Sequence, residues 1–108
     1  MTFDVQVRQG SNELTLILRG ELDMAATDTL HKALLDLKEL DDALPTTIVV
    51  DLRQLEFLDS SGLHGLIDAH DQVRAAGSKV LLVRGPQYVQ RVFELTGVDD
   101  SFEFVDGV

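Results

Sequence analysis

Three polar residues that recur every four positions, Ser60, His64 and Asp68, have the side-chain types of a hydrolytic triad. Residues four apart lie on one face of a helix, so a nucleophile, a base and an orienting carboxylate would line up along it. The sequence has no G-x-S-x-G turn and no evident oxyanion-stabilising element. A stripe that faces solvent also offers no substrate cleft. We therefore expect that the protein is not an enzyme.

Metal binding is a second chemistry that these residue types allow, through His64 with Asp68 or through His70 with Asp71. No further ligands are evident near either pair, the chain has no cysteine, and open helix faces commonly carry such residues. His31 is most simply a histidine on a helix surface. We expect neither a metal nor another cofactor.

The stretch "EFLDSSGLHGL", residues 56–66, has the pattern of a helix start. Asp59 is the predicted N-cap, whose carboxylate accepts a hydrogen bond from the free amide of Ser61 or Gly62. Leu58 before the cap and Leu63 at the fourth helical position have the spacing of a hydrophobic staple. Capping alone would explain all of these residues.

Ser60 would then occupy the first helical position, with its hydroxyl toward solvent. A phosphate there would meet free amides and the positive end of the helix dipole. It would also enlarge the negative patch beside Asp59 without unfolding the domain. From these residues alone, a plain helix start and a phosphorylation switch both remain open.

Gly62 and Gly65 flank "LH" in the first two turns of the same predicted helix. Glycine costs about 1 kcal/mol relative to alanine inside a helix, so the pair indicates a close approach by another part of the structure. We favour the sheet beneath over a partner above.

Alternating polarity in "TFDVQVRQ" and "ELTLILR", with the turn signal "GSN" between them, predicts a β-hairpin at residues 2–19. Apolar residues at helical spacing then predict an amphipathic helix from Met24 to Leu40. The segment "DDALP" should end it, because a residue before proline avoids helical geometry.

The run Ile48–Val50 predicts a buried strand with helices on both faces of its sheet. A loop follows, pinned to the core by Leu55, Phe57 and Leu58, and then a helix over about residues 60–75 that stops near Gly77. "SKVLLVRG" predicts a second buried strand, and "SFEFV" a short last strand. Between them, "PQYVQRVFELTG" predicts a third helix, with proline in its first turn and glycine at its C-cap.

The predicted order of strands and helices, β β α β α β α β, is that of an α/β fold. We expect one domain spanning residues 1–108, with a mixed, mostly parallel β-sheet that begins with an antiparallel hairpin and packs against helices.

The net charge of −10, from 9 basic and 19 acidic residues, disfavours nucleic acid and anionic membranes as partners. No apolar run approaches the roughly 20 residues that cross a bilayer. The first ten residues lack the basic and apolar regions of a signal peptide. We therefore expect a cytoplasmic protein.

Three segments together resemble the STAS domain family, and within it the small bacterial anti-sigma-factor antagonists of partner-switching systems. They are "RGELDMAATDTL", "IVVDLRQLEFLDSSGLHGLI" and "VQRVFELTGVDDSFEF". The resemblance extends from about residue 3 to residue 105. D-S-S-G-L at a helix start, preceded by G-E-L-D after a hairpin, is more specific than either motif alone.

The resemblance implies a STAS-like fold and a switch. In the family, the first serine of D-S-S-G, here Ser60, is phosphorylated by an anti-sigma factor that is a serine kinase of the histidine-kinase-like ATPase fold. The unphosphorylated antagonist binds this kinase and releases the sigma factor, and a PP2C-type phosphatase resets the phosphorylated form. Asp23 and Asp59 match acidic residues near the phosphorylation site, and Ser61 matches the second serine, which is not the usual acceptor.

The implied partner-binding surroundings of Ser60 are Asp23, Asp59, Ser61, Gly62, Leu63 and His64. His64 departs from the small residue often found there, which indicates a specialised kinase-facing surface. Many members also carry a further helix after the last strand, whereas this sequence stops at "VDGV". The alternative within the family is a STAS regulatory module of a lipid- or anion-transport complex or of a stress-sensing assembly.

Overall fold

The computed structural model describes residues 2–40 and 45–107. The opening hairpin is as predicted: β1 (Phe3–Gln9) pairs antiparallel with β2 (Glu13–Leu22). The first helix, α1 (Met24–Leu40), has the predicted bounds. The segment predicted to end it, "DDALP", lies outside the described residues except for Pro45.

The remaining elements follow the predicted order. They are β3 (Thr47–Leu58), α2 (Ser60–Ala75), β4 (Lys79–Val83), α3 (Gln87–Thr96), the 3-10 helix η1 (Asp99–Ser101) and β5 (Phe104–Val105). The sheet has the strand order β1-β2-β3-β4-β5, with every pairing after the hairpin parallel. The predicted α/β fold with a mixed, mostly parallel sheet is therefore confirmed.

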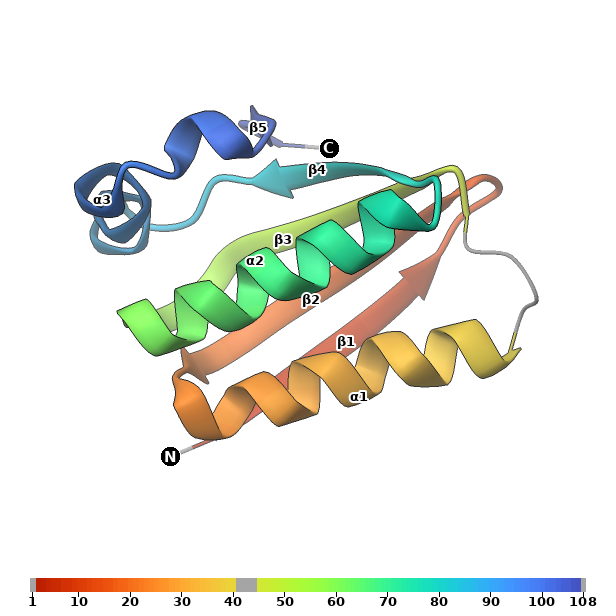
Figure 1. Ribbon diagram of the computed structural model, residues 1–108, viewed down its shortest axis with the longest axis horizontal. Coiled ribbons are helices and arrows are strands. Elements are labelled where there is room, and N and C mark those ends of the chain that lie inside the picture. Colours follow the sequence, from red (N-terminus) through yellow and green to blue (C-terminus); the bar gives the residue numbers. More distant parts are fainter. Residues whose placement is uncertain (1, 41–44, 108) are drawn as a thin grey trace.

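In the described ranges 2–40 and 45–107, helices cover one face of the sheet, and the prediction that helices cover both faces is wrong. Figure 1 shows α1 and α2 side by side in front of β1, β2 and β3. The row Leu16–Val50–Leu82, across neighbouring strands, belongs to the single core cluster to which all three helices contribute buried residues. The next row, Ile17–Asp51–Val83, points to the opposite face. Val49 on that face is nevertheless fully buried, because a central strand is shielded by the side chains of its neighbours.

The predicted loop between the third strand and the second helix is part of β3. Register shifts in the pairing with β2 let the strand bend and continue to Leu58. Leu55 and Leu58 are buried as predicted, whereas Phe57 is 43% exposed and does not pin the chain to the core. Alternation along a strand explains the difference, since Phe57 faces away from its neighbour Leu58.

The helices α2 and α3 each end close to a glycine, as predicted. Gly77 and Gly97 have φ values of 99° and 75°, in the left-handed region that glycine adopts without strain. Pro86 is the N-cap of α3 and does not lie in its first turn. Between its two ends, α3 buries Val89 and Phe93 fully.

Candidate functional site

The two motifs of the sequence meet at the ends of neighbouring strands. Leu22 and Leu58, the last residues of β2 and β3, are paired across the parallel ladder. Asp23 follows the first and Asp59 follows the second, and each leads directly into a helix. The structure therefore brings "GELD" and "DSSG" together at the carboxyl edge of the sheet.

Both aspartates are helix N-caps. The Asp59 carboxylate accepts a hydrogen bond from the Gly62 amide at 2.7 Å, as predicted. The Asp23 carboxylate accepts one from the Ala26 amide at 3.0 Å. The capping role of Asp23 was missed from the sequence, although an aspartate before an amphipathic pattern is its ordinary signal. Two half-buried carboxylates thus fix two helix starts side by side.

Ser60 is the first residue of α2, and its side chain is exposed, as expected for that position. Ser61 is half-buried. Of the two adjacent serines, Ser60 is therefore the more exposed.

Gly62 and Leu63 lie beneath this surface rather than on it. A Cβ at Gly62 would overlap the backbone carbonyl of Leu22, which confirms the predicted approach to the sheet. At Gly65 the close neighbour is the Thr27 side chain of α1, so the prediction of a sheet contact there is wrong. Leu63 is 1% exposed and belongs to the core. These residues position the surroundings of Ser60, but a partner would not touch them directly.

The stripe Ser60, His64 and Asp68 is exposed along its whole length. Residues four apart on α2 do share one face, as predicted. Such a face provides no desolvated site in which a serine, a histidine and an aspartate would act as a triad. Across residues 2–40 and 45–107, no group of three metal-ligating side chains gathers to hold a metal ion.

Met24 and Phe57, close in sequence to the two capping aspartates, have exposed apolar side chains, which the sequence pattern did not reveal. Met24, directly after Asp23, is 71% exposed, and Phe57, two residues before Asp59, is 43% exposed. Tyr88 on α3 is 53% exposed and donates its hydroxyl to the Leu55 carbonyl at 3.1 Å. Exposed apolar side chains mark a docking surface where they form a contiguous patch.

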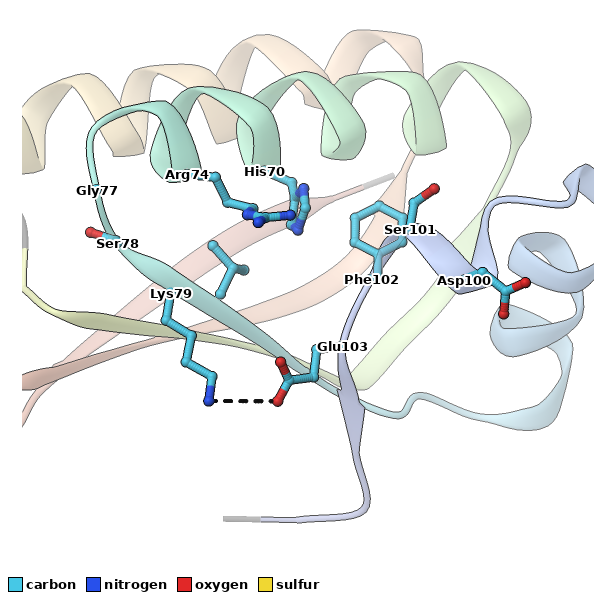
Figure 2. Close-up of a pocket in the computed structure, with 10 residues that line it drawn as sticks. His70, Arg74, Gly77, Ser78, Lys79, Asp100, Ser101, Phe102 and Glu103 are labelled. Atoms are coloured by element: carbon cyan, nitrogen blue, oxygen red, sulfur yellow. Dashed lines mark ion pairs between the residues drawn. The ribbon is translucent and has the colours of Figure 1, made fainter.

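A cavity of about 590 Å³ lies at the other end of α2. Figure 2 shows His70 and Arg74 on one side of it and the chain from Asp100 to Glu103 on the other. Arg74 is 14 residues from Ser60, or about 21 Å along a helix axis. Burial lowers the pKa of His70, partly opposed by Asp71, whose carboxylate lies 3.4 Å from Nδ1. The cavity is thus separate from the Ser60 surface.

Membrane insertion through a helix finds no support in the part of the chain that the structure describes, because no helix there is both long and apolar enough to span a bilayer.

Comparison with known proteins identifies relatives over most of the chain. The family model described as "STAS domain" matches residues 3–108. The "Anti-sigma-B factor antagonist" of Bacillus subtilis (strain 168) is 26% identical over 103 residues, which are 95% of this chain and 91% of that protein.

Solved structures share the fold. An anti-sigma factor antagonist from Mycobacterium paratuberculosis has a TM-score of 0.79 at 24% identity, covering 99% of this chain and 88% of the other. The antagonist SpoIIAA in its unphosphorylated form has a TM-score of 0.67 at 22% identity, with coverages of 96% and 89%. The phosphorylated form of SpoIIAA, described as a Bacillus cell fate determinant, gives 0.64 at 22%, with coverages of 94% and 90%.

Proposed function

Because this chain belongs to the STAS domain family, we propose that it is a bacterial anti-sigma factor antagonist whose docking surface is switched off by phosphorylation of Ser60. The observation that carries the proposal is the placement of Ser60. Ser60 is exposed at the first position of α2, directly after the capping Asp59. The next turn packs against the end of β2 through Gly62, and β2 leads into the second capping aspartate, Asp23.

The unphosphorylated surface suits a protein partner. Met24 and Phe57, next to the capping aspartates in the sequence, and Tyr88, bonded to the Leu55 carbonyl, offer exposed apolar area, and its burial by a partner would be favourable by about 25 cal/mol per Å². The partner in this proposal is an anti-sigma factor that is also a serine kinase of the histidine-kinase-like ATPase fold. Binding of the antagonist would free the sigma factor, in the cytoplasm where transcription occurs.

Phosphorylation would change this surface without unfolding it. The phosphate adds between 1.5 and 2 negative charges at about pH 7, and it would do so next to Asp59 and near Asp23. The first turn of α2 tolerates such a group, because its free amides and helix dipole favour an anion. The same charge opposes burial against the partner. A PP2C-type phosphatase would restore the binding form.

Relatives support the proposal at two points. The Bacillus subtilis relative carries the name of an anti-sigma-B factor antagonist. SpoIIAA, which shares the fold, exists in unphosphorylated and phosphorylated forms. In this proposal the chain is a substrate of the kinase and a competitor of the sigma factor, not an enzyme.

The test is affinity capture from a lysate of the source cells, with captured proteins identified by mass spectrometry. The wild type and Ser60→Ala should retain an ATPase-fold kinase, and Ser60→Asp should lose it. Ser11→Asp is the matched control, since it adds the same charge at an exposed serine in the turn between β1 and β2, away from the Ser60 surface. Capture of one transporter or large assembly by all four proteins would instead identify a STAS module of the other kind.

A further inference from the structure

The exposed face of α2 carries a histidine one helical turn beyond Ser60. Ser60 and His64 are both exposed, and α2 is continuous from Ser60 to Ala75. Four residues apart on a helix, their Cβ atoms lie about 5–6 Å from each other. We infer that His64 binds the phosphate of the form phosphorylated at Ser60, an inference that rests on the proposed function.

The backbone holds these two positions in a fixed relation. Gly62, between the two in sequence, packs against the Leu22 carbonyl. Gly65, directly after His64, packs against the Thr27 side chain. The Asp59 cap fixes the first turn. Because the face of α2 that carries both glycines lies against β2 and α1, Ser60 and His64 lie together on its outer face.

The chemistry of the pair is complementary near neutral pH. A serine phosphate has acceptor oxygens and a second pKa of about 6, and a protonated imidazole carries the opposite charge and two N–H donors. Each group therefore favours the charged state of the other, and an imidazole N–H donates to a phosphate oxygen.

The other charges near His64 do not displace the phosphate. Asp68 lies one turn after His64 on the same face, but it carries one charge, and an acid C-terminal to its base at this spacing is the weaker order. A phosphate on Ser60 has the favourable order and nearly two charges. Other charged or titratable groups lie on α2 and on the elements packed against it. They are Asp71 and Arg74 on α2, Asp59 and Asp23 before α2 and α1, Asp28, His31, Lys32 and Asp36 on α1, Arg91 and Glu94 on α3, and Lys79 at the far end of β4.

The pairing has a regulatory consequence. With the imidazolium beside it, the phosphate keeps its second negative charge to a lower pH than a free phosphoserine does. The form that does not bind the partner would therefore persist when the surroundings become mildly acidic.

The test uses the full chain with phosphoserine installed at position 60 during translation, so that it does not depend on a natural kinase. A ³¹P NMR titration gives the second pKa of the phosphate. His64→Gln should raise this pKa by about 0.5 unit, the size expected for an exposed charge pair. His31→Gln, which removes a half-buried histidine of α1, is the control and should leave it unchanged.

A second readout is the imidazole ¹⁵N chemical shift of His64 at pH 7, which should move toward imidazolium values only when Ser60 is phosphorylated. Equal phosphate pKa values in the His64→Gln and His31→Gln proteins would overturn the inference. If the pair couples while affinity capture finds no kinase, the proposed function fails and the phosphate site stands. If the kinase is captured but the phosphate pKa does not depend on His64, the proposed function stands and the inference about His64 fails.

Discussion

Gly62 is held from two sides, by the Asp59 carboxylate 2.7 Å from its amide nitrogen and by the Leu22 carbonyl where a Cβ would lie. The first contact fixes the helix start, and the second fixes the start against the end of β2. Ser60, two residues earlier in the chain, therefore has a defined place at the surface before any partner binds. Pre-organisation of this kind reduces the ordering cost of association.

Removal of the Asp59 cap should weaken the fold modestly. Asp59→Ala leaves the Gly62 amide without its acceptor, and we expect a loss of about 1 kcal/mol in the free energy of unfolding. Urea denaturation checks this, with Asp28→Ala on the exposed face of α1 as the control. Equal midpoints for the two variants would show that the cap contributes nothing.

Gly62→Ala should destabilise the protein although alanine is the better helix former. Propensity alone would favour alanine by about 1 kcal/mol, but the new Cβ overlaps the Leu22 carbonyl, which is backbone and cannot move aside cheaply. Overpacking of this kind costs about 1–3 kcal/mol, which lowers the melting temperature by several degrees. Gly107→Ala, where no atom lies within 4 Å, is the control. A melting temperature for Gly62→Ala at or above that of the wild type would contradict the prediction.

Asp51 should contribute stability that is lost in acid. This buried carboxylate, on the sheet face without helices, accepts hydrogen bonds from the Arg53 side chain at 2.8–3.3 Å and from the Arg53 amide at 3.0 Å. The Arg53 hydrogen bonds hold the pKa of Asp51 below its ordinary value of 3.8. The stabilisation is therefore complete above pH 3.8 and is lost as the pH falls through the lowered pKa. Asp51→Asn should remove this part of the pH dependence and cost about 1–3 kcal/mol at pH 7, measured by urea denaturation from pH 7 to pH 2.

His70 should produce a separate pH effect nearer neutrality. Burial lowers its pKa below the ordinary 6.5, so the unfolded chain takes up a proton that the folded chain resists. Stability should consequently fall as the pH drops below 6.5, until the lowered pKa of the folded state is passed. In His70→Gln this segment of the urea-midpoint curve should flatten, while the change below pH 3.8 should remain. A curve unchanged between pH 7 and pH 5 would show that His70 is not the group responsible.

Local signals were sufficient for much of this fold. The 3.6-residue period predicted α1 to its observed bounds, and Asp59, Gly77 and Gly97 marked helix ends by capping chemistry. Packing between distant segments gave no such signal. Nothing in "RQLEFL" indicates that β3 bends along β2 to Leu58, and three apolar residues in succession do not tell whether a second helix layer exists.

The candidate site likewise has some features that local sequence signals predict and others that depend on packing between distant segments. Asp59 as a cap and Ser60 as an exposed hydroxyl follow from positions within one helix start. The pairing of Leu22 with Leu58, which brings Asp23 beside them, depends on the register of a parallel ladder. Exposure of Phe57 depends on the phase of the strand, because a one-residue change would have buried it. The exposure of Phe57 therefore became evident only from the structure.

The choice between the two adjacent serines provides a direct test of the switch. Ser60 is exposed at the first position of α2, whereas Ser61 is half-buried. A kinase needs the acceptor hydroxyl in its own active site, so Ser61→Ala should leave most of the phosphorylation intact and Ser60→Ala should abolish it. Incubation of each variant with the captured kinase and ATP, followed by intact-mass spectrometry, distinguishes the two. Loss of the phosphate in Ser61→Ala alone would assign the switch to Ser61, and exposure would not be what selects the acceptor.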